Sequence, residues 1–157
     1  MTIVCGIDPG PEKSAIVRWD GCEAFVPRYL PNLEVRAYIE DYEIGQVAVE
    51  WVHCYGRAVG EEVFRTAWWA GRFCELAFHG CGETTTGFQL FTRRDVCRAL
   101  IGDQQAKKAQ VNAYLRDTFG PVGTKKKPGP LYGVSGHVWD ALAVAVVAHR
   151  GLNGAKP

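Results

Sequence analysis

Three acidic residues interrupt stretches of the sequence that are otherwise apolar, and they are the first candidates for chemistry. Asp8 ends an apolar segment just before a Pro-Gly turn, Glu50 ends another, and Asp140 begins the last apolar segment three residues after His137. A carboxylate that is taken out of water is costly unless it is paired, hydrogen bonded or bound to a cation. A convergent set of such acids therefore predicts a site for a divalent metal ion.

Each of these residues also has an ordinary structural interpretation. Asp8 can cap a turn, Glu50 can pair with an arginine, and Asp140 can favour the positive end of the final helix. His137 can bind a metal ion, or it can hydrogen bond to the acid one turn later and orient it. Taken one at a time, the acids do not decide between these interpretations, so the order of the elements that carry them matters.

Turn residues and hydrophobic periodicity predict a chain of mixed α/β type. Alternating apolar residues around the Asp20-Gly21 turn predict an N-terminal meander of three strands. Asn32 is a candidate helix cap, and apolar residues at helical spacing predict longer helices further along the chain. We predict strands over residues 2–8, 14–20, 22–29, 46–49 and 87–91, and helices over residues 32–42, 59–78, 94–100, 104–118 and 138–149.

The composition is typical of a single globular domain, with 157 residues, of which 47% are hydrophobic and 22% charged. The net charge of +1 means that a nucleic-acid surface must come from local clusters of basic residues. Residues 120–136 hold five glycines, three prolines and three lysines, which predicts a flexible basic loop. The basic clusters comprise Arg93, Arg94, Lys107, Lys108, Lys125, Lys126 and Lys127.

The six cysteines lack the paired spacing of a structural zinc site, and the group of Cys74, His79 and Cys81 is too irregular to predict one. The N-terminal residues have no charged leader, and no apolar run reaches the length of a membrane span. We therefore expect a cytoplasmic protein with no membrane partner, whose cysteines are reduced core thiols.

The order of the predicted elements resembles the RNase H-like fold, with acids on the first strand, the fourth strand and the last helix. Three segments also resemble signature segments of the RuvC-type Holliday junction resolvases: residues 6–10 (GIDPG), 49–50 (VE) and 137–145 (HVWDALAVA). The match spans nearly the whole chain. It implies a single RNase H-like nuclease domain over residues 1–157, with a mixed five-stranded sheet of antiparallel meander and parallel strands flanked by helices.

The same resemblance implies catalytic and metal-binding roles for Asp8, Glu50 and Asp140, with His137 in a fourth position that is an acid in some members. Two Mg²⁺ ions about 4 Å apart can activate water, neutralise the transition state and stabilise the leaving oxygen. Mn²⁺ is expected to substitute, because one ligand is an imidazole. Lys108 fits best the basic residue that the family carries on a helix, and the other basic clusters would hold the phosphate backbone.

Two further features of the family have candidates in this sequence. An aromatic residue is expected a few positions beyond the second acid, and Trp51, His53 and Tyr55 all qualify. Paired cuts imply a homodimer, for which the helix with Trp68 and Trp69 is a candidate face. One of these adjacent tryptophans can equally belong to the core, because the two point about 100° apart.

The resemblance thus implies an endonuclease that makes paired symmetric nicks in Holliday junctions during DNA recombination and repair, in a bacterial cell or a phage-infected host. A broader nuclease for flaps and forks, or a junction-binding protein without catalysis, stays open as an alternative. A sugar-kinase-like or actin-like ATPase also places an aspartate after its first strand. Such a protein needs two related domains and a second phosphate loop, for which this chain has no room.

Overall fold

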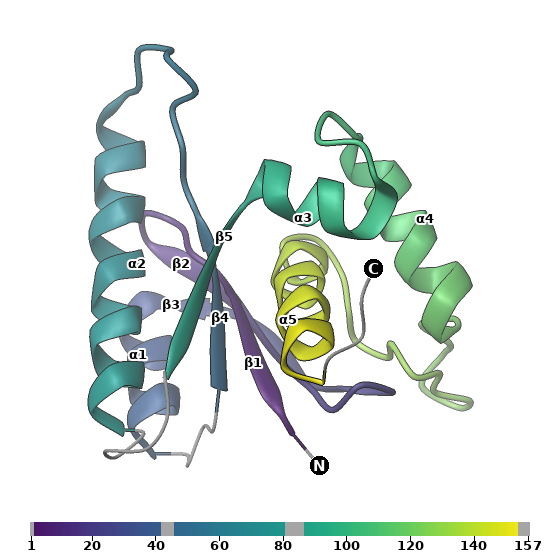
Figure 1. The fold of residues 1–157 in the computed structure, drawn as a ribbon. Coiled ribbons are helices and arrows are strands. Elements are labelled where there is room, and N and C mark those ends of the chain that lie inside the picture. The colour runs from purple at the N-terminus through teal and green to yellow at the C-terminus, as the bar shows by residue number, and fades with distance from the viewer. Residues whose placement is uncertain (1, 42–45, 81–86, 154–157) are drawn as a thin grey trace.

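The computed structural model describes residues 2–41, 46–80 and 87–153 and shows a five-stranded sheet with helices on both faces (Figure 1). The strands are β1 (Val4–Asp8), β2 (Lys13–Trp19), β3 (Ala24–Pro31), β4 (Gln46–Trp51) and β5 (Phe88–Thr92). The helices are α1 (Asn32–Asp41), α2 (Glu61–Gly80), α3 (Arg93–Ile101), α4 (Lys108–Phe119) and α5 (Val138–Leu152). Within the described ranges, none of the helices has both the length and the hydropathy to cross a membrane.

The sheet combines antiparallel and parallel pairing in the order β3-β2-β1-β4-β5. The first three strands form an antiparallel meander, whereas β4 pairs with β1, and β5 with β4, in parallel. Parallel neighbours need a crossover connection, and α2 supplies the one between β4 and β5. The predicted mixed five-stranded sheet with flanking helices is therefore confirmed.

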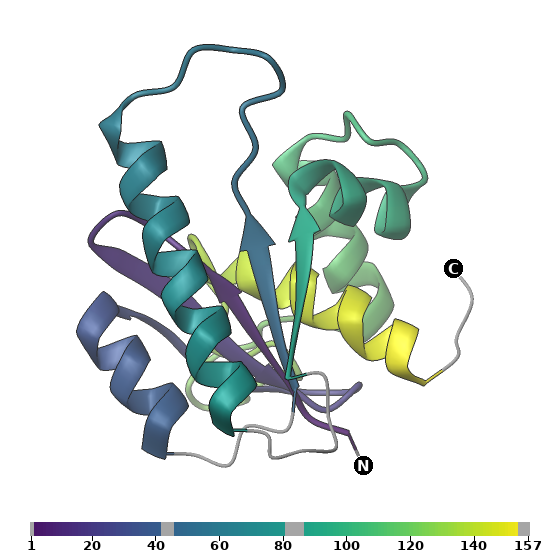
Figure 2. The same ribbon diagram turned by 60° about the vertical axis from the view of Figure 1, so that its left-hand side comes forward.

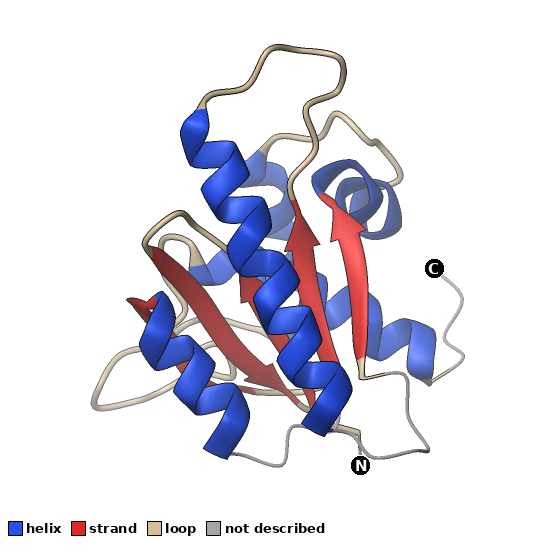
Figure 3. Ribbon diagram, turned by 90° about the vertical axis from the view of Figure 1, so that its left-hand side faces the viewer, coloured by secondary structure: helices blue, strands red, loops and turns tan. Residues whose placement is uncertain are grey.

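The two faces of the sheet carry separate apolar clusters. Helices α1 and α2 cover one face, and α5, with α3 and α4 beside it, covers the other (Figures 2 and 3). The largest fully buried side chain on the α5 face is that of Trp19, and the largest on the α1–α2 face is that of Phe73. The nearly uniform burial of the Ala- and Val-rich α5 agrees with its predicted place against the sheet.

Strand alternation decides which face the acids of the sheet occupy. In β1, Ile7 packs in the cluster under α1 and α2, so the next residue, Asp8, lies on the α5 face. In β4, Val49 belongs to the same cluster as Ile7, so Glu50 also lies on the α5 face. Both acids of the sheet are therefore presented to the helix that carries Asp140.

All the predicted elements are present, but most of their boundaries differ from the structure by one to four residues. Asn32 is the first residue of α1, and its side-chain amide binds the turn after β1 instead of capping the helix. Asp103 accepts a hydrogen bond from the main-chain N–H two residues later, and after this turn α4 begins only at Lys108, not at residue 104. β4 continues one residue past Glu50, so this acid lies inside the strand.

The cysteines of the described residues are all free thiols, but not all of them belong to the core. Those on β1, α2 and α3 are buried, as predicted. Cys22 and Cys54 lie in connections that follow strands and are exposed, so the prediction of core thiols is wrong for these two. Cys81, part of the irregular Cys/His group in the sequence, lies outside the described residues.

The connection between α4 and α5, residues 120–136, is partly packed on the domain. Leu131 and Val134 are buried in the cluster of the α5 face. The main-chain N–H of Ala24, at the start of β3, donates a 2.9 Å hydrogen bond to the carbonyl of Pro130. The second half of the connection is thus held against the sheet, whereas the flexibility expected of the segment stays a prediction.

A glycine allows α5 to lie directly on the central strand. A Cβ atom at Gly6 of β1 would lie 2.0 Å from the carbonyl oxygen of Ala141 and 2.8 Å from the Cβ of Ala145. Real Cβ atoms do not approach other heavy atoms so closely, so only glycine fits this position without a shift of the helix. Two small residues on α5 and one glycine on β1 therefore set the distance between helix and sheet.

Substitution of Gly6 by alanine should destabilise the fold, because α5 must move away from β1 to make room for the methyl group. We expect Gly6→Ala to lower the free energy of unfolding by about 1–3 kcal/mol, as overpacking in cores does. Urea denaturation followed by circular dichroism measures this change. Gly151→Ala is the matched control, because Gly151 is also on α5 but a Cβ there has no neighbour within 4 Å. Equal stability of the two variants would contradict the close contact.

Candidate metal centre

Asp8, His137 and Asp140 converge at one end of the sheet. Asp8 is the last residue of β1, His137 immediately precedes α5, and Asp140 lies in the first turn of that helix. One potential ligand atom from each residue lies within 4.8 Å of those from the other two. The side chains of Asp8 and Asp140 are 16% and 13% exposed, but that of His137 is 60% exposed. Solvent therefore reaches the group mainly from the histidine side.

Glu50 joins this group from the neighbouring strand. The parallel register pairs Ile7 with Val49, so the residues that follow them, Asp8 and Glu50, lie side by side. Their carboxyl groups are close enough for each to change the pKa of the other. The structure thus brings all four residues predicted from the sequence to one place, although the roles expected of them stay predictions.

The environment of the two strand carboxyls favours their neutral forms in the metal-free protein. Burial, reinforced by the negative charge of Asp140, raises the pKa of Asp8 to about 7. Burial, followed by the charges of Asp8 and Asp140, raises the pKa of Glu50 to about 8. The negative charge of Asp8 is among the causes of the raised pKa of Glu50, so the two carboxyls titrate together and a proton on either one reduces the charge of the pair. A bound cation would compete with that proton.

Two basic residues compensate the charge of Asp140. The Nη1 atom of Arg93 lies 3.2 Å from one of its carboxylate oxygens, and the ammonium group of Lys108 donates to the other. Arg93 begins α3 after a capping box in which Thr92 and Asp95 bind each other's main-chain N–H groups. Lys108 begins α4. The first residues of two helices, Arg93 and Lys108, therefore both pair with Asp140.

The turn after Asp8 is fixed by a buried polar network. The hydroxyl of Ser14 accepts a 3.1 Å hydrogen bond from the N–H of Gly10 and donates a 2.6 Å bond to the amide oxygen of Asn32. The amide nitrogen of Asn32 in turn donates to the carbonyl of Gly10 at 2.9 Å. Both main-chain groups of the residue two positions after Asp8 are thus bound, which restricts the orientation of the strand end that carries this acid.

The donor set fits a hard divalent cation. Adjacent ligands of an octahedral ion with bonds near 2.1 Å lie about 3 Å apart. The Nδ1 atom of His137 lies 3.2 Å from Oδ2 of Asp8. Carboxylate oxygens are typical ligands of Mg²⁺, and an imidazole is accepted by Mn²⁺ and other transition metals. Asp8, His137 and Asp140 could therefore hold one such ion, with Glu50 beside Asp8.

Arg94, predicted to bind DNA, lies over an aromatic ring close to this end of the sheet. Its guanidinium carbon is 3.9 Å from the centroid of Tyr55, and the ring of His53 is 4.5 Å from the same centroid. Both rings lie in the connection that follows β4 and are exposed, whereas Trp51 packs against the cluster of the α1–α2 face. Tyr55 and His53 are thus the accessible aromatic candidates beyond Glu50.

The remaining predicted DNA-binding residues do not contact the carboxylates. Lys107 precedes α4, and its N–H donates to the side chain of Gln110. The three lysines of residues 125–127 follow the far end of α4, whose twelve residues span roughly 18 Å. They are exposed, in a turn closed by main-chain hydrogen bonds between Thr124 and Lys127. Their separation from Lys108 means that they could contact only a more distant part of a long ligand.

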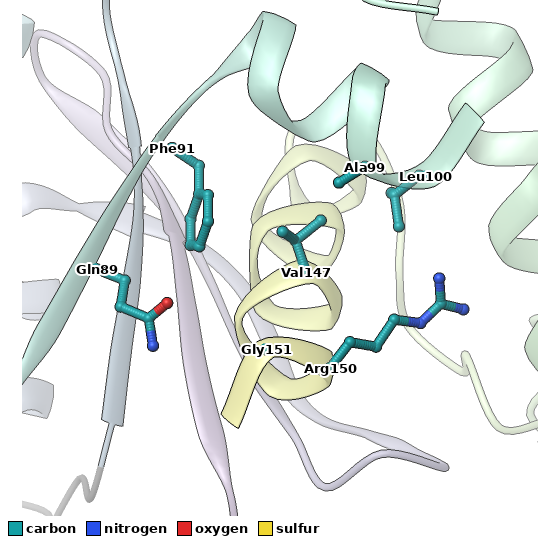
Figure 4. A pocket seen from close by; sticks show the side chains of 7 residues that line it. All are labelled: Gln89, Phe91, Ala99, Leu100, Val147, Arg150 and Gly151. Atoms are coloured by element: carbon teal, nitrogen blue, oxygen red, sulfur yellow. The ribbon is translucent and has the colours of Figure 1, made fainter. Parts of the chain in front are cut away.

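A separate cavity of about 230 Å³ lies between β5, α3 and α5 (Figure 4). Its polar side chains are those of Gln89 and Arg150, and the guanidinium of Arg150 already donates a 2.8 Å hydrogen bond to the hydroxyl of Tyr114. None of its lining residues is acidic or nucleophilic. The carboxylate group, and not this cavity, therefore offers the chemistry. The lining residues are Gln89, Phe91, Ala99, Leu100, Val147, Arg150 and Gly151.

Three residues that support the site were not identified from the sequence. Ser14 and Asn32 hold the turn after Asp8, and the ring of Tyr29 stacks on that of His137. Ser14 follows Asp8 by only six residues, and a buried polar residue within a predicted apolar strand was the available signal. The position of Tyr29 depends on strand register and had no comparable signal.

Two solved structures share the fold of this chain. Thermus thermophilus RuvC superposes with a TM-score of 0.70 at 21% sequence identity, over 98% of this chain and 98% of that chain. T. thermophilus RuvC in complex with a Holliday junction substrate gives a TM-score of 0.71 at 20% identity, over 99% and 98% of the two chains. No family model and no curated protein sequence matches the chain. The chain therefore has the RuvC-type, RNase H-like fold that the sequence predicts.

The raised pKa values predict that the metal-free protein loses stability as the pH rises. Between the ordinary carboxyl pKa near 4 and the folded values of about 7 and 8, the folded state binds more protons than the unfolded state. Stability therefore falls as the pH passes through that interval. We expect Glu50→Gln to raise the free energy of unfolding at pH 9 by on the order of 2 kcal/mol, and to change it little at pH 4.

Urea denaturation at several pH values in the presence of a chelator measures this effect. Asp117→Asn, which removes an exposed acid of α4, is the control and should leave the pH dependence unchanged. A Glu50→Gln protein with the same pH profile as the unmodified chain would show that the folded state does not hold this carboxyl in its neutral form.

Proposed function

We propose that this protein is a RuvC-type resolvase, a single nuclease domain over residues 1–157 that cleaves Holliday junctions with divalent metal ions. The observation that carries the proposal is the convergence of Asp8, Glu50, Asp140 and His137 at one accessible end of the sheet. The fold shared with RuvC, which has been solved on a Holliday junction substrate, supports the choice of DNA as the ligand.

Each residue of the site would have a separate role in phosphodiester hydrolysis. Asp8, at the centre of the group, would supply carboxylate oxygens to two Mg²⁺ ions together with Glu50 and Asp140. When bound, the ions supply activation of water and neutralisation of the developing charge, and Mn²⁺ can serve in their place. His137, open to solvent, would bind an ion or orient the attacking water.

Basic residues around the carboxylates would hold the DNA backbone. Arg93 and Lys108 neutralise Asp140 in the metal-free protein. A metal ion bound by Asp140 would take over that role and leave the two cations available to phosphate oxygens. Arg94 and Tyr55 offer a cation and an aromatic face on the same end of the molecule. Lys107 and the three lysines of residues 125–127 would reach more distant phosphates.

A homodimer would allow two symmetric cuts, and α2 offers a face for it. Phe64 and Trp68, one turn apart on this helix, are 66% and 60% exposed. Trp69 packs instead against the apolar cluster of its own chain. Of the two adjacent tryptophans, Trp68 is therefore the one available to a second copy of the chain.

Cleavage of a labelled four-way DNA junction tests the proposed activity. With Mg²⁺ or Mn²⁺, we expect paired symmetric nicks, and little cutting of linear duplex or flap DNA of the same sequence. Asp8→Asn should reduce the rate by roughly 100- to 1000-fold, because it removes a ligand whose charge offsets that of the metal ions. Binding of the junction should persist. Asp117→Asn, an equivalent change far from the site, should leave the rate unchanged.

The other outcomes separate the alternatives. Equal cutting of junctions, flaps and forks would indicate a broader nuclease for branched DNA. Junction binding without any metal-dependent cleavage would reject the catalytic proposal and leave a binding protein with this fold. Cleavage that survives in Asp8→Asn would move the active site away from the carboxylate group.

The salt dependence of junction binding tests the proposed phosphate contacts. Each lost contact should reduce the slope of log affinity against log salt concentration by about 0.9. We expect a reduction of about one for Arg94→Gln and of up to about three when Lys125, Lys126 and Lys127 are all changed to glutamine. Binding is measured with a chelator present, so that cleavage does not interfere. Arg36→Gln, on α1 and paired with Glu40, should keep the original slope. An unchanged slope in the triple variant would exclude the lysines from the DNA surface.

A further inference from the structure

Strand register places an aromatic residue in the same row as the carboxylates. Asp8 of β1 pairs with Ala15 of β2, and Ala15 pairs with Tyr29 of β3. Paired residues of neighbouring antiparallel strands present their side chains to the same face. The small side chain of Ala15, which is fully buried, therefore separates Asp8 from Tyr29 on the α5 face.

This placement of Tyr29 depends on an irregularity of β3. Near the hairpin, Arg18 of β2 pairs with Phe25 of β3. Ile16, two residues before Arg18, pairs with Arg28, which is three residues after Phe25. The strand β3 thus contains one extra residue, and without it Arg28 would lie opposite Ala15. Val26, within the bulge, has a φ of 49°, a conformation that costs energy for a β-branched residue. The bulge therefore places Tyr29 opposite Ala15, on the face of the sheet that carries Asp8.

Tyr29 supports the most exposed member of the metal-binding group. Its ring stacks on the imidazole of His137 with 5.1 Å between the ring centroids and an angle of 18° between the planes. The side chain of His137 is 60% exposed, and its only other contact among the described hydrogen bonds is with Asp8. Two contacts, one from each end of the row, thus determine where this imidazole lies.

We propose that Tyr29 is a positioning residue that holds the imidazole of His137 in the metal-binding group. The proposal rests on the metal centre of the proposed function. Tyr29 is itself 49% exposed, so burial in the core does not explain its place. Its hydroxyl is not needed for stacking, which makes the aromatic ring the functional part. An ordered imidazole loses less conformational entropy when it binds a metal ion than a freely rotating one.

Nuclear magnetic resonance of the metal-free protein tests the contact directly. In the unmodified chain, the His137 ring protons should be shifted upfield by the ring current of Tyr29 and should show cross-relaxation with its ring protons. Tyr29→Phe should keep the shift, and Tyr29→Leu should lose it. The signal is identified by its absence in His137→Ala, because the chain has four histidines. Tyr132→Leu, another exposed tyrosine, is the control and should not change the shift.

Titration with Mn²⁺ in the absence of DNA tests the consequence for metal binding. We expect Tyr29→Leu to weaken Mn²⁺ binding roughly three- to ten-fold, and Tyr29→Phe to restore it. In a His137→Ala background, Tyr29→Leu should have no further effect. A loss that is equally large in that background, or no loss at all, would overturn the positioning role.

These readouts also separate this inference from the proposed function. If the unmodified chain binds no Mn²⁺, the proposed metal centre fails, and with it the functional part of the inference, whatever the ring-current shift shows. If the chain binds Mn²⁺ normally in Tyr29→Leu but binds junction DNA more weakly, Tyr29 is a DNA-stacking residue and the positioning role is rejected.

Discussion

The site depends on how closely α5 approaches the central strand of the sheet. The absence of a side chain at Gly6 lets the backbone at Ala141 lie against β1. Asp8 lies two residues beyond Gly6 on the same face of the strand, and His137 lies one turn before Ala141. Because the backbone of α5 contacts that of β1, the imidazole of His137 can lie 3.2 Å from the carboxylate of Asp8. A helix that lay only a methyl group further away would separate His137 and Asp140 on the α5 side from the carboxyl groups of the sheet.

That geometry concentrates negative charge, and the surrounding chain balances it in two different ways. On the strands, burial raises the pKa values of Asp8 and Glu50, so that protons reduce the charge. On the helix, Arg93 and Lys108 pair with Asp140. Protons and ammonium or guanidinium groups are exchangeable partners, whereas the positions of the carboxyl groups are fixed by strand and helix. A divalent cation can therefore replace these partners without rebuilding the fold, which is what a preorganised metal site requires.

The parts of the structure that sequence could predict are those governed by local patterns. Period-two alternation and turn residues predicted the strands, and helical spacing predicted α2 and α5. The interrupted apolar segments identified the three acids of the site, and the resemblance to RuvC-type resolvases added His137. Partners distant in sequence were not predictable in this way. Asn32 is a residue type that commonly caps helices, but its buried side chain binds the carbonyl of Gly10. Without this bond the carbonyl would lack a partner, and buried polar groups are normally paired. The positive charge of the lysines at 125–127 predicts contact with DNA, but charge alone carries no information on their distance from the carboxylates.

The four side chains of the site differ in how firmly the chain holds them, and the difference follows from the elements that carry them. Asp8 and Glu50 are on paired strands, and the turn after Asp8 is bound at both main-chain groups of Gly10. His137 immediately precedes α5, where its carbonyl accepts hydrogen bonds from the N–H groups of Asp140 and Ala141 but its side chain faces solvent. Such a residue can approach substrate, but it needs an external contact to define its orientation. The bulge in β3 places Tyr29 where it makes that contact, so an irregularity in an edge strand completes a site that regular elements leave open on one side.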